Sequence, residues 1–357
     1  MPLGSHRSRK VLSSDPAKGS AIIRVMIGGE ESGAASEPIP VVWCVDIEPF
    51  HRQVEEPPEP HWRGVLETME SLDRWRPALQ DATGEAVRFS WFWRADPQVE
   101  EVYGTAGWGL SRYKDLLDAT LLRGDAHGIH PHFWRRDDPS SAWIEDFRDP
   151  RWVEHCVRVA FAAFEAQVGS PPLVNRCGDR RMDSRTARLL GRLGIRADLS
   201  VEPGVPSDCL ETNVARPDYT AATSRPYRPA ANDFNRPRRR PVARDGLTML
   251  PLTTRSPASG RSRDFFHPWD DSTVTTAAVD ALLADDQRYL AFAIRSDGPL
   301  AEWWTNVESL LDHLRTHPLA PRFVFATPIE ALSLLNGRHR TPPQVRSGGR
   351  QAPHTTS

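Results

Sequence analysis

The sequence predicts an α/β protein built on a parallel sheet or barrel. Apolar runs of strand length alternate with stretches of helical periodicity throughout residues 38–337. Several of these runs are apolar on both faces, as strands covered on two sides are. The chain has 357 residues, and one α/β barrel commonly takes about 250 residues or more. A single barrel with tails therefore fits the length.

The expected strands are continuous apolar, β-branched or aromatic runs. The clearest is Ile39–Ile47, whose centre Val41–Val45 has no polar side chain. The remaining candidates are 87–93, the stretch 127–134 as a strand or the exit from one, 195–201, 247–252, 289–294 and 323–326.

The expected helices show apolar residues at a spacing of three or four. The clearest begins at Asp149 and Pro150, a good N-cap and first residue, and ends at Gly169. Ser184 is the expected cap of another helix, which Gly194 terminates. The remaining helices are expected at 62–79, 111–122, 272–284 and 299–316.

Composition divides the chain into three parts. Residues 1–37 are rich in Ser, Gly and Ala without periodicity and predict a flexible N-terminal arm. Residues 38–337 form the barrel domain. Residues 338–357 contain four arginines and no acidic residue, which predicts a disordered basic tail.

Charge and cysteine usage exclude several function classes. Lys and Arg number 45 and Asp and Glu 47, so the chain has no bulk attraction for nucleic acid or an anionic membrane. Its three lysines leave few candidates for Schiff-base chemistry, and its four cysteines form no CxxC pair. No apolar run approaches the about 20 residues of a membrane helix. We expect a soluble, cytoplasmic protein.

Two carboxylates follow the first strand. Asp46 and Glu48 are two positions apart, so both side chains share one face of an extended segment. Active sites of parallel α/β folds gather at the carboxyl ends of strands. A solvated turn beside Pro49 is the alternative interpretation.

A histidine cluster follows the third expected strand. His130 and His132 also share one face if the segment is extended. With a carboxylate they would make a three-ligand site for Zn²⁺ or a similar divalent ion, leaving a position open for water. His127 is an alternate ligand or, in preference, a packing residue. The pair could equally bind no metal.

A third polar group follows the apolar run 171–174. Arg176 would lie at another strand end, where its guanidinium could orient a carboxylate. A surface ion pair is the alternative. The arginine-rich stretch 236–244 is expected to be an exposed loop, because it has no interleaved aromatic residues.

With these three groups in order, residues 40–332 resemble NodB-type polysaccharide deacetylases, also called carbohydrate esterase family 4, in a divergent bacterial branch. Val45–Glu48 resembles the first motif, Gly124–Trp134 the histidine motif, Arg176–Arg180 the arginine motif and Ala197–Pro203 the segment that follows. The resemblance implies a distorted (β/α)7-type barrel and metal-dependent removal of an acyl group from an N-acyl sugar or related amide.

The resemblance also implies roles. Asp46 is the catalytic base, Arg176 orients it, and Glu48, His130 and His132 bind a divalent metal, with Zn²⁺ as the first candidate. The metal activates water, and an acid protonates the leaving nitrogen. The residues assigned to substrate contact or to support of the ligands are Trp134, Asp179, Asp198, His267 and His127.

Three features depart from the family pattern. His130 and His132 are two residues apart rather than four, and Trp134 stands at the fourth position. Cys177-Gly178 replaces a proline-aromatic pair. Arg295 stands where the family has a late histidine acid, and arginine does not donate a proton at neutral pH. His267 is the candidate substitute, although its spacing differs.

Two hypotheses therefore compete. The first is a working deacetylase that acts on a carbohydrate or N-acyl small molecule. The second is a catalytically degenerate barrel that binds a glycan or a partner without turnover. A weaker third is a glycoside hydrolase using Asp46 and another acid, which would not need the histidines.

The tripartite organisation makes a prediction about stability. A chain reduced to residues 38–337 should melt within a few degrees of the full chain, because polar, aperiodic ends bury little apolar area. Differential scanning calorimetry of both chains measures this, and a large drop would mean that one end packs on the barrel.

Overall fold

A computed structural model describes residues 37–49, 62–137, 140, 142–207, 217–239, 246–256, 263–297 and 300–337; of residues 300–302 it describes the backbone alone. The expectations for the tail 338–357, and for the arm apart from Glu37, lie outside these residues. Within them, no helix has the length and hydropathy needed to cross a bilayer.

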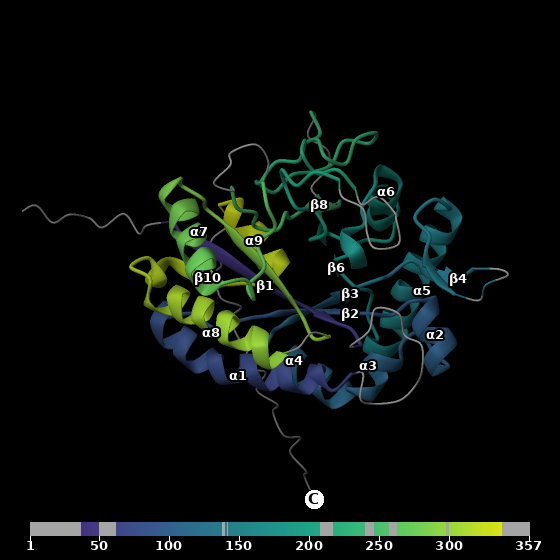
Figure 1. Ribbon diagram of the computed structural model, residues 1–357, viewed down its shortest axis with the longest axis horizontal. Helices are drawn as coiled ribbons and strands as arrows, with labels where there is room; N and C mark the ends of the chain where they lie inside the picture. Colours follow the sequence, from purple (N-terminus) through teal and green to yellow (C-terminus); the bar gives the residue numbers. More distant parts are fainter. Residues whose placement is uncertain are drawn as a thin grey trace, which may run out of the picture. The chain divides into compact units, whose positions relative to one another are not determined.

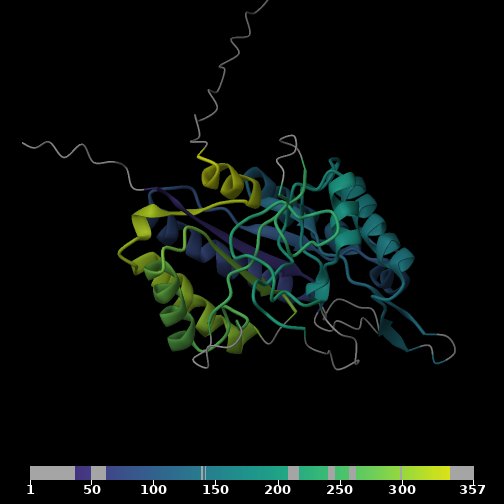
Figure 2. The same cartoon turned by 90° about the horizontal axis from the view of Figure 1, so that it is seen from above.

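The central element is a curled parallel sheet (Figures 1 and 2). Its strands pair in the order β1 (Ile39–Ile47), β2 (Ser90–Trp93), β3 (Ala126–Ile129), β6 (Val174–Asn175), β7 (Ala197–Asp198) and β8 (Thr248–Met249). β9 (Leu290–Arg295) pairs with the other side of β1. Beyond β8, the Thr253 N–H donates to the carbonyl of Ala291 in β9 at 2.9 Å. This bond joins the two ends of the sheet.

β10 (Phe323–Phe325) pairs with the first three residues of β1, on the side where β2 pairs with the last four. The other seven parallel strands, as far as the structure describes them, form the ring. The predicted distorted (β/α)7-type barrel is confirmed.

Helices cover the outside of the ring. They are α1 (Gly64–Thr83), α2 (Pro97–Tyr103), α3 (Trp108–Arg112), α4 (Lys114–Leu122), α5 (Pro150–Val168), α6 (Ser184–Arg192), α7 (Ser272–Ala284), α8 (Leu300–Thr316) and α9 (Pro328–Leu335). α1 and α8 pack side by side, and α8 also contacts α7 (Figure 1). A separate antiparallel pair consists of β4 (Trp134–Arg136) and β5 (Trp143–Glu145). Two 3-10 turns are η2 (Gly178–Arg180) and η3 (Ala320–Arg322).

Several boundaries differ from the expectations. The stretch 111–122 belongs to two helices, α3 and α4, which meet at Tyr113. The stretch 127–134 is a strand only as far as Ile129, after which the chain leaves the sheet. The cap of α6 is Asp183, which accepts from the Thr186 N–H, because the Ser184 hydroxyl accepts from the Phe234 N–H instead.

Side-chain alternation separates an inner from an outer core. On β1, Val41, Trp43 and Val45 belong to the larger cluster beneath the helices, whereas Val42 and Cys44 belong to a second cluster. That second cluster is the barrel interior, filled mainly by alternate strand residues and closed by α9; its buried members are Val42, Cys44, Phe92, Val174, Ala197, Leu199, Leu250, Leu252, Tyr289, Ala291, Ala293, Ala326 and Ala331.

The same alternation determines which side chains lie at the carboxyl end of β1. Because residues two apart share a face, the inward column Val42 and Cys44 continues to Asp46 and Glu48. The barrel interior therefore ends in polar side chains at the carboxyl edge of the sheet.

A buried carboxylate attaches α1 to the sheet on the helix side. Asp125 accepts two hydrogen bonds from Arg76 of α1, at 3.0 and 2.5 Å. It also accepts from the Phe89 N–H at 3.1 Å and from Trp91 Nε1 at 2.8 Å. One side chain thus joins a helix and two strands.

Asp125→Ala should lower the free energy of unfolding by about 3–5 kcal/mol, because it leaves the largely buried Arg76 with only Asp73 and the Val87 carbonyl as partners and removes the acceptor of two further buried N–H groups. Denaturant unfolding measures the change. Asp118→Ala is the matched control: it breaks an exposed ion pair with Lys114 within α4 and should cost less than about 1 kcal/mol. Equal losses in the two variants would contradict the role given to Asp125.

Candidate functional site

The inward columns of five strands, β1, β2, β3, β6 and β9, end at one place. Beyond Phe92, the next inward position on β2 is Arg94; beyond Val174 it is Arg176, and beyond Ala293 it is Arg295. Arg295 pairs in register with Asp46. His130 and His132 follow β3 with the same parity. The alternation that fills the barrel below with apolar side chains therefore brings charged and imidazole groups together above it.

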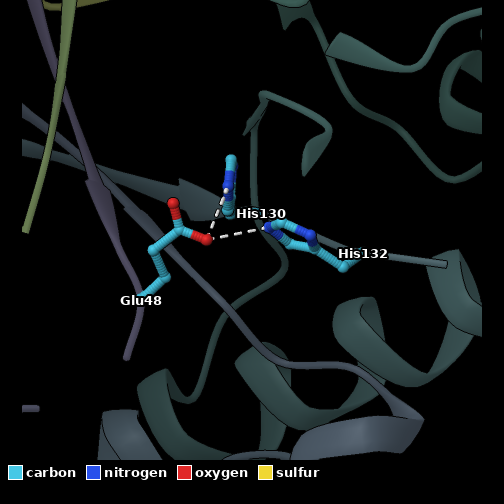
Figure 3. Close-up of side chains that lie close together, drawn as sticks. All are labelled: Glu48, His130 and His132. Carbon is cyan, nitrogen blue, oxygen red and sulfur yellow. Dashed lines mark ion pairs between the residues drawn. The ribbon is translucent and has the colours of Figure 1, made fainter. Parts of the chain in front are cut away.

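Glu48, His130 and His132 converge (Figure 3). Glu48 Oε2 lies 2.9 Å from His132 Nε2 and 3.8 Å from His130 Nε2. All three residues are buried. Glu48 Oε2 thus faces the Nε2 atoms of both imidazoles. Buried nitrogen and carboxylate oxygen atoms that converge on one point are typical of ligands that share a cation.

Each imidazole is oriented through its other nitrogen. His130 Nδ1 donates to the carbonyl of Arg176 at 2.7 Å, which leaves Nε2 with its lone pair toward Glu48. His132 Nδ1 lies 2.8 Å from Asp179 Oδ2. Carboxylate and carbonyl groups behind metal-binding histidines fix the tautomer in this way.

Asp179 reaches this position through a strained turn. Asp179 and Arg180 both have positive φ, 48° and 56°, a region that costs non-glycine residues about 1–3 kcal/mol each. Arg180 is held by Glu202 at 2.9 Å, and the Tyr219 hydroxyl donates to its carbonyl. Ion pairing and hydrogen bonding therefore keep the turn in place.

Gly178 makes room for His132. A Cβ at this position would lie 2.3–2.5 Å from three ring atoms of His132. The glycine of the third motif is therefore required by close approach to the imidazole. In the sequence Gly178 stands out only as a departure from the family's proline-aromatic pair, and the structure shows which side chain needs the glycine.

Asp46 is fixed by Arg176. Arg176 Nε donates to both carboxylate oxygens, at 2.9 and 3.0 Å, and Arg176 Nη1 donates to the Leu199 carbonyl at 3.0 Å. Asp46 Oδ1 also lies 3.6 Å from His130 Nδ1. These bonds from a buried guanidinium hold the Asp46 carboxylate in one orientation.

Two arginines flank Glu48, and one of them, Arg94, lies outside the motifs that predicted the site. Arg94 Nη1 lies 4.0 Å from Glu48 Oε2, and Arg295 Nε lies 3.4 Å from Glu48 Oε1. Each arginine has its own carboxylate partner, Asp96 or Asp297. The strand-end rule that selected Asp46 would also have selected Arg94, which directly follows the apolar run of β2.

The charges of this cluster sum to a net negative value. Its carboxylates are Asp46, Glu48, Asp96, Asp179 and Asp297, and its guanidinium groups are Arg94, Arg176 and Arg295. Five acids and three bases leave two negative charges when both imidazoles are neutral. A divalent cation would balance this excess.

The pKa shifts of the two histidines and of Glu48 reflect the charges around them. Burial lowers the pKa of His130, although Asp46 and Glu48 oppose it. Burial and Arg94 also lower the pKa of His132, but the carboxylates of Asp179 and Glu48 outweigh them and raise it above its ordinary value. Burial raises the pKa of Glu48, yet His132 and Arg295 hold it below its usual range. A proton on His132 and a metal ion would thus compete for the same electrons.

A cavity of about 190 Å³ opens over the cluster. Asp46, Glu48, Arg176 and Asp179 line it, together with both histidines and Arg295. His267 lines it as well, with Phe265 and Trp269 beside it. The structure thus brings His267 to the site from a distant part of the sequence.

Three of the expected site residues, His127, Trp134 and Asp198, do not line this cavity. His127 accepts from Trp93 Nε1 at 2.9 Å and contacts the Thr120 hydroxyl at 3.0 Å, and burial lowers its pKa to about 3. It is a neutral packing residue on the helix side of β3. Trp134 begins β4, is buried, and does not line the cavity described above.

Asp198 supports the arginine loop from behind. It accepts from Asn175 Nδ2 at 2.6 Å and from the Ser200 hydroxyl at 3.1 Å. The Ser200 oxygen in turn accepts from the Cys177 N–H at 2.8 Å. Burial raises the pKa of Asp198 to about 6. This carboxylate positions the segment that carries Arg176.

A second group of possible ligands lies on the outer helices. His313 Nε2 and His317 Nε2 lie 2.7 and 3.4 Å from Asp280 Oδ1. The Leu319 N–H donates to His317 Nδ1 at 3.0 Å. The neutral His317 ring therefore has its proton on Nε2, which points toward Asp280 as a donor and is not free to bind a metal.

Comparison with protein-family models gives no match, and neither does comparison with curated protein sequences. Solved structures do match. One from Parabacteroides distasonis, named without established activity as a glycoside hydrolase/deacetylase, has a TM-score of 0.53 at 14% identity over 85% of this chain and 73% of that one. A polysaccharide deacetylase from Mycobacterium smegmatis, also provisionally named, has a TM-score of 0.46 at 13% identity over 88% and 97%. The PuuE allantoinase has 0.47 at 13% identity over 86% and 93%.

At these identities the likeness concerns the fold, and of the three the Parabacteroides structure alone exceeds a TM-score of 0.5. The resemblance to NodB-type polysaccharide deacetylases is confirmed at that level. The roles of individual residues have to be argued from the geometry of this chain.

Gly178→Ala should weaken Zn²⁺ binding at least about tenfold, because the added methyl group displaces His132; losses of about 10- to 100-fold are usual when groups around metal ligands are disturbed. Isothermal titration with Zn²⁺ measures the affinity. Gly191→Ala is the control, since its Cβ would meet Leu247 at an ordinary 3.6 Å. Undiminished affinity in Gly178→Ala would remove His132 from the ligand set.

Proposed function

We propose that the protein is a metal-dependent hydrolase that removes an acyl group from an N-acylated sugar or a related small amide. The observation that carries the proposal is the pairing of two arrangements in one cavity. Glu48, His130 and His132 offer three ligand atoms within 4.8 Å of one another, and the fixed carboxylate Asp46 lies beside them.

The ligand atoms fit a divalent ion. Two ligands that each lie about 2 Å from an ion are within about 4 Å of each other, and Glu48 Oε2 meets this with both imidazoles. Two nitrogens and one carboxylate oxygen suit Zn²⁺ and leave a position open. Such an ion would polarise the acyl carbonyl and lower the pKa of water.

Asp46 supplies the base. It lines the cavity and is held in one orientation by Arg176. In the proposed reaction Asp46 accepts a proton from the attacking water, which adds to the acyl carbon. Because both Asp46 oxygens accept from Arg176, neither is placed to give a proton to a leaving group, which disfavours a glycoside hydrolase that would use Asp46 as its acid.

A catalytically degenerate barrel that binds a glycan or partner is the second candidate. Arg295 favours it, because its guanidinium occupies the position of the late histidine and is bound by Asp297 at 2.7 and 2.6 Å. A binding protein, however, has no need for an oriented carboxylate beside a three-ligand site.

Asp46→Asn should retain Zn²⁺ and lose about 10²- to 10⁴-fold in kcat, the usual contribution of a positioned general base. The measurement is deacetylation of N-acetylglucosamine, its oligomers and simple acetamides by the Zn²⁺-loaded protein, with metal content determined in parallel. Arg176→Lys should also lose activity, because an ammonium does not reproduce the planar fork.

Two results would overturn these assignments. Loss of Zn²⁺ in Asp46→Asn would make Asp46 a ligand. A wild-type protein that binds Zn²⁺ and an N-acetyl sugar without turnover would favour the degenerate barrel.

A further inference from the structure

Addition of water to an amide places negative charge on the acyl oxygen. The new C–O bond forms while the π electron pair of the carbonyl moves to that oxygen. A hydrogen-bond donor that already faces the oxygen stabilises this charge, and one such donor commonly contributes about 10²- to 10³-fold to kcat. A donor for the oxyanion is therefore needed in the cavity in addition to the base Asp46.

Several donors close to the base already have acceptors. The N–H of Cys177 donates to a serine hydroxyl oxygen at 2.8 Å, and the N–H of Gly178 donates to a proline carbonyl at 2.9 Å. Arg176 donates to the base and to a backbone carbonyl, and Arg180 is bound by Glu202. The segment that carries Arg176 thus uses these groups to hold its own shape.

Arg295 is held in one orientation at the end of β9. Its Nε and Nη2 donate to the two oxygens of Asp297 at 2.7 and 2.6 Å. Its guanidinium carbon also lies over Trp303, 6.0 Å from the ring centroid. Two parallel hydrogen bonds to one carboxylate fix the plane of a guanidinium. A donor fixed in this way does not have to reorganise during a reaction.

The third nitrogen of Arg295 remains available. Within the part of the chain that the structure describes, Nη1 has no hydrogen-bond or ion-pair partner. The side chain is 23% exposed, and Arg295 lines the cavity together with Asp46. Because guanidinium stays protonated in proteins, Nη1 offers N–H donors of a positively charged group at every working pH.

Arg295 also lies next to both the base and a candidate ligand. It pairs in register with Asp46, so the two residues are neighbours on adjacent strands. Its Nε is 3.4 Å from Glu48 Oε1, whereas the other oxygen of Glu48 faces the two imidazoles. The guanidinium is therefore close to the place where a carbonyl under attack by water would be bound.

We propose that Arg295 is a catalytic residue that stabilises the oxyanion of the acyl group through Nη1, with Asp297 as its positioning residue. The inference rests on the proposed hydrolase function. In the addition step, the water oxygen bonds to the acyl carbon, one water proton passes to Asp46, and the carbonyl π pair moves to the acyl oxygen. That oxygen accepts a hydrogen bond from Nη1, and the guanidinium keeps all its protons.

The first test compares an amide with an ester. Arg295→Met should lose about 10²- to 10³-fold in kcat on N-acetylglucosamine. The loss on 4-nitrophenyl acetate should be similar, because attack of water on the ester creates the same oxyanion although its leaving group needs no proton. The matched control is Arg288→Met, near the other end of β9. Arg288 pairs with Asp286 and Glu37 on the surface, and its variant should match the wild type on both substrates.

The second test needs no turnover. Methylphosphonate is an anion with the tetrahedral shape of the adduct between water and an acetyl group. In isothermal titration of the Zn²⁺-loaded protein, Arg295→Met should bind it at least about tenfold more weakly, because a charge-assisted hydrogen bond is lost. The affinity for Zn²⁺ should not fall, since Arg295 is not a ligand. Arg295→Lys should restore only part of the methylphosphonate affinity, because an ammonium does not reproduce the planar fork that Asp297 binds.

Other results would overturn the inference. Unchanged rates and methylphosphonate affinity in Arg295→Met would do so and leave the hydrolase function standing, as would a loss confined to the amide, which would place Arg295 at the leaving group. Loss of Zn²⁺ would show that Arg295 acts by holding Glu48. Full recovery in Arg295→Lys would remove Asp297 from its positioning role. A Zn²⁺-loaded wild type that cleaves neither substrate would overturn the proposed function together with the inference.

Discussion

Arg176 is the residue on which the site depends. Its guanidinium donates to both oxygens of Asp46 and to the Leu199 carbonyl, and its own carbonyl accepts from His130 Nδ1. One residue after β6 thus orients the candidate base on β1 and a candidate ligand after β3, and ties both to the segment after β7. Removing one partner of such a buried ion pair costs about 3–5 kcal/mol, because the other charge remains buried.

Small side chains inside the barrel support this arrangement. Alanines and Cys44 fill much of the inner cluster, and α9 closes it. Small side chains let strands approach closely: at Gly128 a Cβ would lie 2.4 Å from the Val174 carbonyl. β3 and β6 can therefore bring His130 and Arg176 together at their ends.

The residues that line the cavity are placed in two different ways. Asp46 is placed by strand geometry, since it continues an inward column of β1. His267 is placed by a loop beyond β8 in which Phe266 is buried and packs on Phe292 of β9. Arg295 and His267 line one cavity, so a loop contributes an imidazole to the same space to which a strand end contributes a guanidinium.

Local sequence patterns predicted much of the fold. The Ile39–Ile47 and 272–284 boundaries were predicted to the residue, because an apolar run and an amphipathic helix are encoded by neighbouring residues. The boundaries of 111–122 and 127–134 were not, since where a helix breaks or a strand leaves the sheet depends on what packs against it. Alternation likewise predicted that Asp46 and Glu48 share a face.

The sequence by itself thus determined which side chains end the strands and what chemistry they can perform. Tertiary structure decided which of them meet. It placed His127 in the core and His132 against Gly178, added Arg94 beside Glu48, and brought His267 over the cavity. The physical reason is that parity along a strand is a local property of the backbone. Contacts between residues far apart in the chain depend instead on how whole elements pack, and no local pattern records that packing.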